Sequence, residues 1–253
     1  MPHKLTIIIP VYNEGANFKE LWSNLSQQIR GEFIAYVVYD FPDDDTVPII
    51  KQIIADGEQR LQLLQNNMRR GVLGAILTGF QKATSGPVLV VMADLSDDLA
   101  QVHEMLELYE RGYKVVVGSR YMPGGKLLGG PFFKQLLSRL AGLSLYCFRG
   151  LPTHDATNAF KIYDAEMLHA LKLESRGGFE LGLEITVKAF LNGYPIAEVP
   201  AHWWDRTAGK SQFRLWSWLP QYLKWYLYAF QPRKTLGSVQ ASAAPRPRTT
   251  PAE

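Results

Sequence analysis

The strongest constraint on the fold is a regular alternation of short apolar runs and amphipathic segments in the first half of the chain. The runs have the length and β-branched content of buried strands, and the segments between them repeat apolar residues at helical spacing. Strands are expected to end at Pro10, Asp40, Asn66, Asp94 and Arg120, with helices at 17–29, 46–57, 71–86 and 97–112. Alternating strands and helices predict an α/β fold, a mostly parallel sheet flanked by helices on both faces.

The residues at the ends of these expected strands are polar. In a parallel sheet the carboxyl ends of the strands meet at one edge, and ligands bind there. We therefore expect this edge to gather residues that are far apart in the sequence, namely Tyr12, Asn13, Glu14, Asp40, Asp94, Ser119 and Arg120.

The stretch VVMADLSDD (90–98) places three carboxylates at the end of a buried strand. Concentrated negative charge at a sheet edge is costly unless a positive group balances it. A Mg²⁺ or Mn²⁺ ion would do so, because such hard cations prefer carboxylate and phosphate oxygens. The alternative is a solvated strand end in which Asp97 or Asp98 caps the next helix. Spacing alone does not decide between them.

Composition limits the class of protein. The chain has 253 residues and a formal net charge of +3, too small to indicate a nucleic-acid partner. Its single cysteine, Cys147, excludes an internal disulfide framework and suits a reducing compartment. The apolar run 5–11 is too short for a signal peptide, and no run reaches the roughly 18 apolar residues of a transmembrane helix. We therefore expect a cytoplasmic protein.

The second half of the chain is less regular. We expect an apolar helix at 132–150, a turn entering a strand at 155–163, a helix at 178–193 and a strand at 194–203. An aromatic-rich segment follows, and its tryptophans and tyrosines are Trp216, Trp218, Tyr222, Trp225, Tyr226 and Tyr228. The Ala, Pro and Ser content of 235–253 predicts a disordered tail.

Seven motifs occur in an order that resembles glycosyltransferase family 2. They are IIIPVYNE, VVYDFPDDDT, RRGVLGAILTGFQKA, VVMADLSDD, VVVGSRYMPGG, DATNAF and GYPIAEVPAHWWDRTAGKSQF. The first is common across the family, whereas the last three narrow the resemblance to the polyprenyl-phosphate (dolichol-phosphate) hexose synthases. The resemblance covers 4–215 and implies a GT-A (Rossmann-like) nucleotide-sugar-binding domain over 1–213.

The resemblance implies an activity as well as a fold. It is the inverting transfer of a hexose, mannose or glucose, from a GDP- or UDP-linked nucleotide sugar to a polyprenyl or dolichyl phosphate. That acceptor is already an anion near neutral pH, so the enzyme must position it and neutralise the leaving diphosphate rather than deprotonate it. Two alternatives stay open: a family 2 transferase with a saccharide or other hydroxyl acceptor, and a non-catalytic nucleotide-sugar-binding protein.

The resemblance also assigns residues to the donor. Pro10, Tyr12 and Glu14 would hold the base and ribose, and Asp40 would contact the nucleoside. Gly71 and Gly74 would let the backbone approach a phosphate. Plainer interpretations are a strand terminator for Pro10, a helix cap for Asp40 and tight helix packing for the glycines.

The chain departs from the family at two acidic motifs. Tyr39-Asp40 holds one acid where the family has a pair, and Met92 replaces the first acid of the Asp-x-Asp metal motif. Methionine is a poor ligand for a hard cation. The resemblance leaves Asp94 as the main ligand of Mg²⁺ or Mn²⁺, with Asp97 as its helper. The alternative is a weak or absent metal, with basic residues holding the diphosphate.

Basic residues for phosphate occur at matching places: Arg120, Lys134, Arg206 and Lys210. The resemblance gives Arg120 and Arg206 catalytic contacts, and Lys134 and Lys210 contacts with the substrates. Solvated surface cations are the alternative. Asp155, in DATNAF, would orient a sugar hydroxyl or the acceptor, or else cap a turn.

The segment 214–234 is expected to be an amphipathic helix whose regular part begins at Gln221, after Pro220. Tryptophan, tyrosine and cations suit a membrane interface, whereas packing on the domain or a dimer contact would also bury aromatic rings. A lipid acceptor favours the membrane. We therefore expect a peripheral protein on the cytoplasmic membrane face, or one tethered by a membrane-anchoring partner protein.

Overall fold

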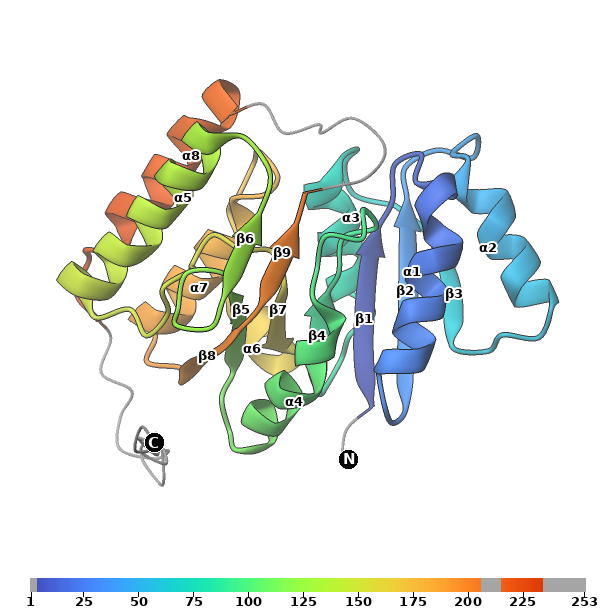
Figure 1. The fold of residues 1–253 in the computed structure, drawn as a ribbon, viewed down its shortest axis with the longest axis horizontal. Coiled ribbons are helices and arrows are strands. Elements are labelled where there is room, and N and C mark those ends of the chain that lie inside the picture. Colours follow the sequence, from blue (N-terminus) through green and yellow to red (C-terminus); the bar gives the residue numbers. More distant parts are fainter. Residues whose placement is uncertain (1–3, 206–214, 234–253) are drawn as a thin grey trace.

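The computed structural model describes residues 4–205 and 215–233, which build a seven-stranded sheet with helices on both sides (Figure 1). The strand order is β3-β2-β1-β4-β7-β5-β8. The strands are β1 (Leu5–Pro10), β2 (Phe33–Tyr39), β3 (Leu61–Gln65), β4 (Pro87–Val90), β5 (Val115–Ser119), β7 (Lys161–Asp164) and β8 (Ile196–Pro200). All neighbours run parallel except β7, so the predicted mostly parallel sheet is confirmed.

Two apolar layers separate the sheet from its helices. One lies under α1 (Gly15–Gln28), α2 (Thr46–Ala55) and α4 (Val102–Glu110), and the other under α3 (Val72–Phe80), α6 (Ala165–Ala170), α7 (Leu181–Leu191) and α8 (Leu215–Tyr228). Successive strand side chains point to opposite faces, so Ile7 and Ile9 of β1 join the first layer and Ile8 joins the second.

Strand β7 runs against its neighbours and therefore begins where they end. Its first residue, Lys161, pairs with Val90 of β4 and with Val117 of β5. The loop before β7, which contains Asp155, consequently reaches the carboxyl edge of the sheet. A parallel strand here would have delivered that loop to the opposite edge.

Several elements differ from the sequence-based expectation. The expected strand 194–203 divides at Ala201 into β8 and β9 (His202–Trp204), and β9 leaves the main sheet to pair with β6 (Lys126–Leu128), which was not predicted. Helix α6 was not predicted either. The expected helix 132–150 consists of α5 (Phe132–Ser144) and a single π-helical turn, Leu145–Arg149, which we call the π turn.

Helix α8 corrects part of the prediction for the aromatic segment. It begins at Leu215 and contains Pro220, so the expected start at Gln221 is wrong. Trp225 is fully buried, with the Nζ of Lys188 4.7 Å from its ring, and belongs to the core rather than to an outer surface. Counting aromatic residues does not reveal which side of a helix they occupy. Within the described ranges, no helix combines the length and the apolar character needed to cross a bilayer.

Replacing Trp225 with alanine is expected to lower the free energy of unfolding by about 3–5 kcal/mol, because it removes a large buried ring. The melting temperature should fall on the order of 10 °C for a chain of this length. Leu223→Ala, at an exposed position of the same helix, is the control and should melt within a degree or two of the parent, since surface changes are about ±0.5 kcal/mol. A Trp225 variant as stable as that control would contradict the core position.

Candidate functional site

The carboxyl edge of the sheet gathers the predicted strand-end residues. β2, β1 and β4 are neighbours, and β7 alone separates β4 from β5. Tyr12, Asp40, Asp94 and Arg120 follow the ends of β1, β2, β4 and β5 respectively. The topology therefore brings these four residues to one edge, as the alternation predicted.

The loop after β1 is fixed by acidic residues that the sequence analysis did not assign. The backbone N–H of Asn13 donates to Asp44 Oδ2 at 3.0 Å, and that of Gly15 donates to Asp45 Oδ1 at 2.9 Å. Asn13 has a φ of 52°, in the left-handed region that asparagine tolerates. The run of aspartates at 43–45, directly after an expected strand, is visible in the sequence. Its bonds to the loop after β1 could not be predicted, because they depend on the pairing of β1 with β2.

Tyr12 and Phe41 form an aromatic pair at the ends of β1 and β2. Their rings meet edge to face at 5.6 Å, and Tyr12 is half exposed. Pro10 is buried as the last residue of β1, and the N–H of the next residue, Val11, donates to the carbonyl oxygen of Val38 in β2 at 3.0 Å. Glu14 accepts a bond from the Asn17 side chain at 2.9 Å. An exposed ring beside a second ring offers a stacking surface to a planar nucleobase.

Asp40 binds the loop between β3 and α3. Its two oxygens accept bonds from Asn66 Nδ2 at 2.6 Å and from the backbone N–H of Gly71 at 2.7 Å. Gly71 has a φ of 100°, which other residues rarely adopt. A Cβ on Gly74 would lie 1.7 Å from the carbonyl oxygen of Arg69, so Gly74 serves tight packing. Asn66 was not singled out from the sequence.

The acidic turn after β4 is tightly bonded to itself. Asp94 is buried, and its Oδ1 accepts bonds from the Ser96 hydroxyl at 2.5 Å and the Ser96 N–H at 3.3 Å. Asp98 accepts from the N–H of Ala100 and so caps the 3₁₀ turn that precedes α4. Leu95 lies in the left-handed region with a φ of 61°. This conformation turns the chain sharply between the acids.

Asp97 occupies a different environment from Asp94. Its Oδ2 accepts the N–H of Met92 at 3.0 Å, and its backbone bridges to Trp203. Burial, followed by repulsion from Asp94, raises the pKa of Asp97 to about 7. Met92 and Asp97 both line a cavity of about 180 Å³ between α1 and the turn, and Trp204 is another of its lining residues.

The residues present fit a divalent cation through one carboxylate. Among the described residues, no group of three or more His, Cys, Asp or Glu side chains is arranged to hold a metal ion. Mg²⁺ often binds one or two carboxylates and takes its remaining ligands from substrate phosphates and water. Asp94 fits that pattern; Asp97 as a second ligand stays a prediction.

Arg120 and Asp155, predicted separately, form a buried ion pair. The guanidinium donates from Nε to Asp155 Oδ2 at 2.6 Å and from Nη2 to Oδ1 at 2.9 Å. The backbone N–H of Arg120 also donates to Oδ2, at 3.1 Å. Asp155 is fully buried. Burial disfavours the charge on Arg120, but the Asp155 carboxylate outweighs it and raises the pKa of Arg120.

Hydroxyl groups and a buried lysine surround this ion pair. Ser138 of α5 bonds the Nη2 of Arg120 at 3.3 Å and Tyr121 at 2.8 Å. The Nζ of Lys161 donates to the carbonyl oxygens of Ala156 at 2.8 Å and Gly182 at 3.2 Å, and burial lowers the pKa of Lys161 to about 7. No motif or expected strand end pointed to Ser138, which lies in the apolar helix expected at 132–150.

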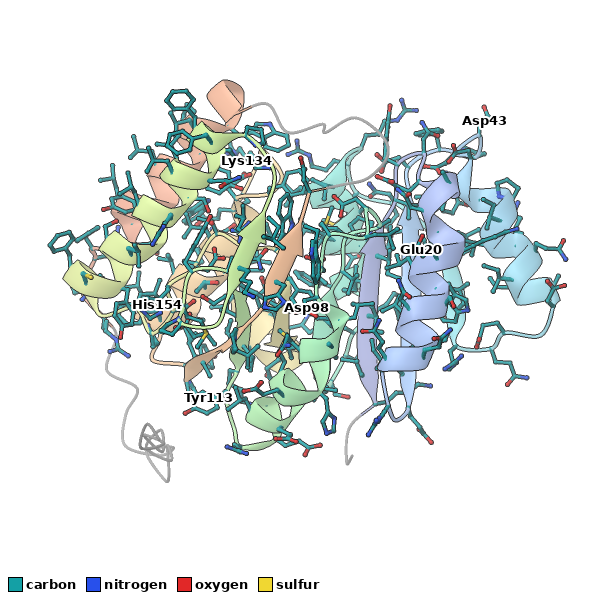
Figure 2. All side chains as sticks on the ribbon, in the orientation of Figure 1. Glu20, Asp43, Asp98, Tyr113, Lys134 and His154 are labelled. Carbon is teal, nitrogen blue, oxygen red and sulfur yellow. The ribbon has the colours of Figure 1, made fainter. Side chains whose placement is uncertain are left out.

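The other predicted phosphate-binding cations are Lys134, Arg206 and Lys210. Lys134 lies half-buried on α5, and Figure 2 shows it on the opposite side of the molecule from Asp43. Arg206 and Lys210 fall outside the described residues. A larger groove of about 680 Å³ between α1 and α2 contains none of the predicted site residues.

Comparison with known proteins bears on this arrangement. The family model "Glycosyl transferase family 2" matches residues 6–172. "Dolichol-phosphate mannosyltransferase" of Pyrococcus furiosus is 28% identical over 216 residues, covering 83% of this chain and 59% of its own length. "Polyprenol monophosphomannose synthase" of Mycolicibacterium smegmatis is 28% identical over 211 residues, covering 81% of this chain and 79% of its own. The chain thus spans about three fifths of the length of the Pyrococcus relative.

Solved structures show the same fold. Glucosyl-3-phosphoglycerate synthase from Mycobacterium tuberculosis, in complex with Mn²⁺, UDP and glucosyl-3-phosphoglycerate, aligns with a TM-score of 0.65 at 15% identity, over 92% of this chain and 82% of that one. S. aureus TarS aligns with a TM-score of 0.57 at 21% identity, over 79% and 60%. These are GT-A structures. The family model matches more than half of the chain, from β1 to α6, so this chain belongs to glycosyl transferase family 2.

Proposed function

We propose that this protein is an inverting glycosyltransferase that moves a hexose, mannose or glucose, from a GDP- or UDP-linked sugar to a polyprenyl phosphate. The observation that supports a phosphate acceptor is the burial of Asp155 and its ion pair with Arg120. This carboxylate is fully buried and both of its oxygens accept bonds from the Arg120 guanidinium, so it is not placed to act as the general base that takes a proton from an acceptor. A hydroxyl acceptor needs such a base, whereas a phosphate acceptor does not.

In this proposal the chain's own residues bind and orient. Tyr12 and Phe41 stack on the base, and the β3–α3 loop held by Asp40 approaches the donor. Asp155 holds the guanidinium of Arg120 in a fixed orientation, so that its charge is positioned for a substrate phosphate before binding. The names of the two curated relatives support this class of acceptor.

Asp94 would hold a Mg²⁺ or Mn²⁺ ion against the donor diphosphate. When bound, the ion supplies positive charge to the leaving nucleoside diphosphate. Structural neighbours solved with Mn²⁺ and UDP support this assignment. Lys134, Arg206 and Lys210 would add cations for the phosphates, and the reaction would take place at the cytoplasmic face of a membrane, with the protein peripheral or tethered by a partner.

Met92→Asp is expected to tighten Mn²⁺ binding by about tenfold or more. The change places a second carboxylate two residues before Asp94, and a hard cation prefers a carboxylate ligand to a thioether. Isothermal titration of Mn²⁺ in the presence of GDP or UDP measures this without any turnover. Met92→Leu is the matched control and should bind Mn²⁺ as the parent does. Equal affinity for all three proteins would contradict a metal position beside residue 92.

The test of the proposed function uses radiolabelled GDP-mannose, GDP-glucose and UDP-glucose, with a polyprenyl phosphate and, in parallel reactions, a saccharide as the acceptor. A thermal-shift screen of the same donors, with and without Mn²⁺, first identifies the nucleotide. Label recovered in an organic-phase lipid supports the proposal. Label recovered on a saccharide indicates the hydroxyl-acceptor enzyme, and donor binding with no transfer indicates a non-catalytic sugar-nucleotide-binding protein.

A further inference from the structure

Exposed apolar side chains gather on α5, the π turn and α8. They make up most of the large exposed apolar side chains of the described residues, and they are Phe132, Phe133, Leu136, Leu137, Leu140, Tyr146, Phe148, Leu223, Leu227 and Phe230. The exposed fraction is 72% for Phe133 and 78% for Phe148. Singly exposed apolar residues are ordinary, but so many on adjoining elements mark an interaction surface.

The two helices and the π turn form one face. α5 and α8 lie side by side in Figure 1, and Tyr226 of α8 donates to Ser144 of α5 at 3.0 Å. Arg149 of the π turn donates to the carbonyl oxygens of Ala229 and Gln231, each at 2.6 Å. We call this surface the α5–α8 face.

The charge on the α5–α8 face has one sign. Residues 132–149 and 215–233 contain lysines and arginines but no aspartate or glutamate, although the chain has 24 acidic residues. Arg139 and Lys224 are exposed there. Glu174, which approaches Lys224 from the loop before α7, is ion-paired with Lys188 at 2.9 Å.

We propose that the α5–α8 face docks on an anionic lipid bilayer. Apolar side chains rimmed by cations match a surface of acyl chains beneath negative headgroups. A second copy of the chain fits less well, because a twofold interface would set this cation-only patch against itself. The docking surface thus centres on α5 and the π turn, with α8 contributing its outer positions rather than Trp225.

Docking at this face would bring the lipid to the reaction site. Ser138, on α5, bonds both Arg120 and Tyr121, so the helix that meets the bilayer also touches the ion pair at the carboxyl edge. This step rests on the proposed function, whereas docking itself does not.

The experiment measures flotation of the full chain with phosphatidylglycerol–phosphatidylcholine vesicles and with phosphatidylcholine vesicles. Phe133→Ser/Phe148→Ser should weaken binding to the anionic vesicles at least about tenfold, since losing one phenylalanine from an apolar phase already has that effect. Arg139→Glu/Lys224→Glu should remove the preference for phosphatidylglycerol. Met68→Ser, at an exposed apolar position outside this face, and Lys19→Glu/Lys51→Glu are the matched controls and should bind as the parent does.

Melting curves confirm that the variants fold, which is expected because all four substituted side chains are exposed. The proposal would be overturned if the parent protein bound neither type of vesicle. It would also be overturned if both double variants bound the vesicles as tightly as the parent does. If the parent protein were a dimer that does not bind vesicles, and the phenylalanine double variant were a monomer, the face would be assigned to a second copy of the chain instead. Sugar transfer to a water-soluble short-chain prenyl phosphate distinguishes the docking proposal from the proposed function. This transfer should persist in the vesicle-binding variants, because it needs no membrane. If the parent protein did not catalyse it, the result would count against the proposed function and not against docking.

Discussion

Asp94→Asn is expected to lower kcat for sugar transfer by at least about a hundredfold, because it removes the carboxylate proposed to hold positive charge at the leaving diphosphate. The amide retains the shape of the side chain and can still accept a bond from the Ser96 hydroxyl, so the melting temperature should change little. Steady-state kinetics across a Mn²⁺ titration, read beside a melting curve, measures both quantities.

The control for Asp94 is Asp43→Asn, which removes an exposed carboxylate from the β2–α2 loop, two strands away from β4 in the sheet. That variant should turn over as the parent does. If Asp94→Asn also retained the parental kcat at every Mn²⁺ concentration, the assignment of the acidic turn to the donor diphosphate would be wrong.

The second large effect is expected at the Arg120–Asp155 pair. Asp155→Asn leaves a buried guanidinium without its carboxylate, so the free energy of unfolding should fall by about 3–5 kcal/mol. Arg120→Met/Asp155→Leu removes both charges and should recover much of that loss, since an apolar pair of similar volume is often tolerated. Urea denaturation of the parent, Arg120→Met, Asp155→Leu and the double variant measures the coupling between the two residues.

Activity distinguishes a functional pair from a structural one. In our proposal Arg120 supplies charge to a substrate phosphate, so the double variant should be stable and inactive. A double variant that regains both stability and turnover would show that the pair only supports the fold.

The sequence predicted the sheet well because the signals for strands and helices are local. Each apolar run and each helical spacing can be recognised within about ten residues, and βα alternation then sets the edge where Asp40, Asp94 and Arg120 meet. The family resemblance added Asp155 to this list. Neither source showed that Asp155 and Arg120 bond each other, because that contact depends on the reversed direction of β7.

Side-chain orientation was harder to predict than element position. Trp225 is buried while Leu227, two residues later, is exposed, and both are apolar residues of one helix. The helical spacing of α5 likewise predicted a helix but not that Phe132 and Phe133 would lack a covering element. Which face of such a helix is covered depends on residues far away in the sequence.

The place of β5 in the sheet has a consequence for chain synthesis. Its two hydrogen-bonding partners, β7 and β8, both lie later in the chain, and β7 is also the second partner of β4. A nascent chain that has emerged only as far as α5 therefore carries β4 with one open edge and β5 with two. Open strand edges are templates for pairing with other chains. The half of the protein that bears most of the site motifs thus acquires protection from aggregation only when the DATNAF loop and the strand after it leave the ribosome.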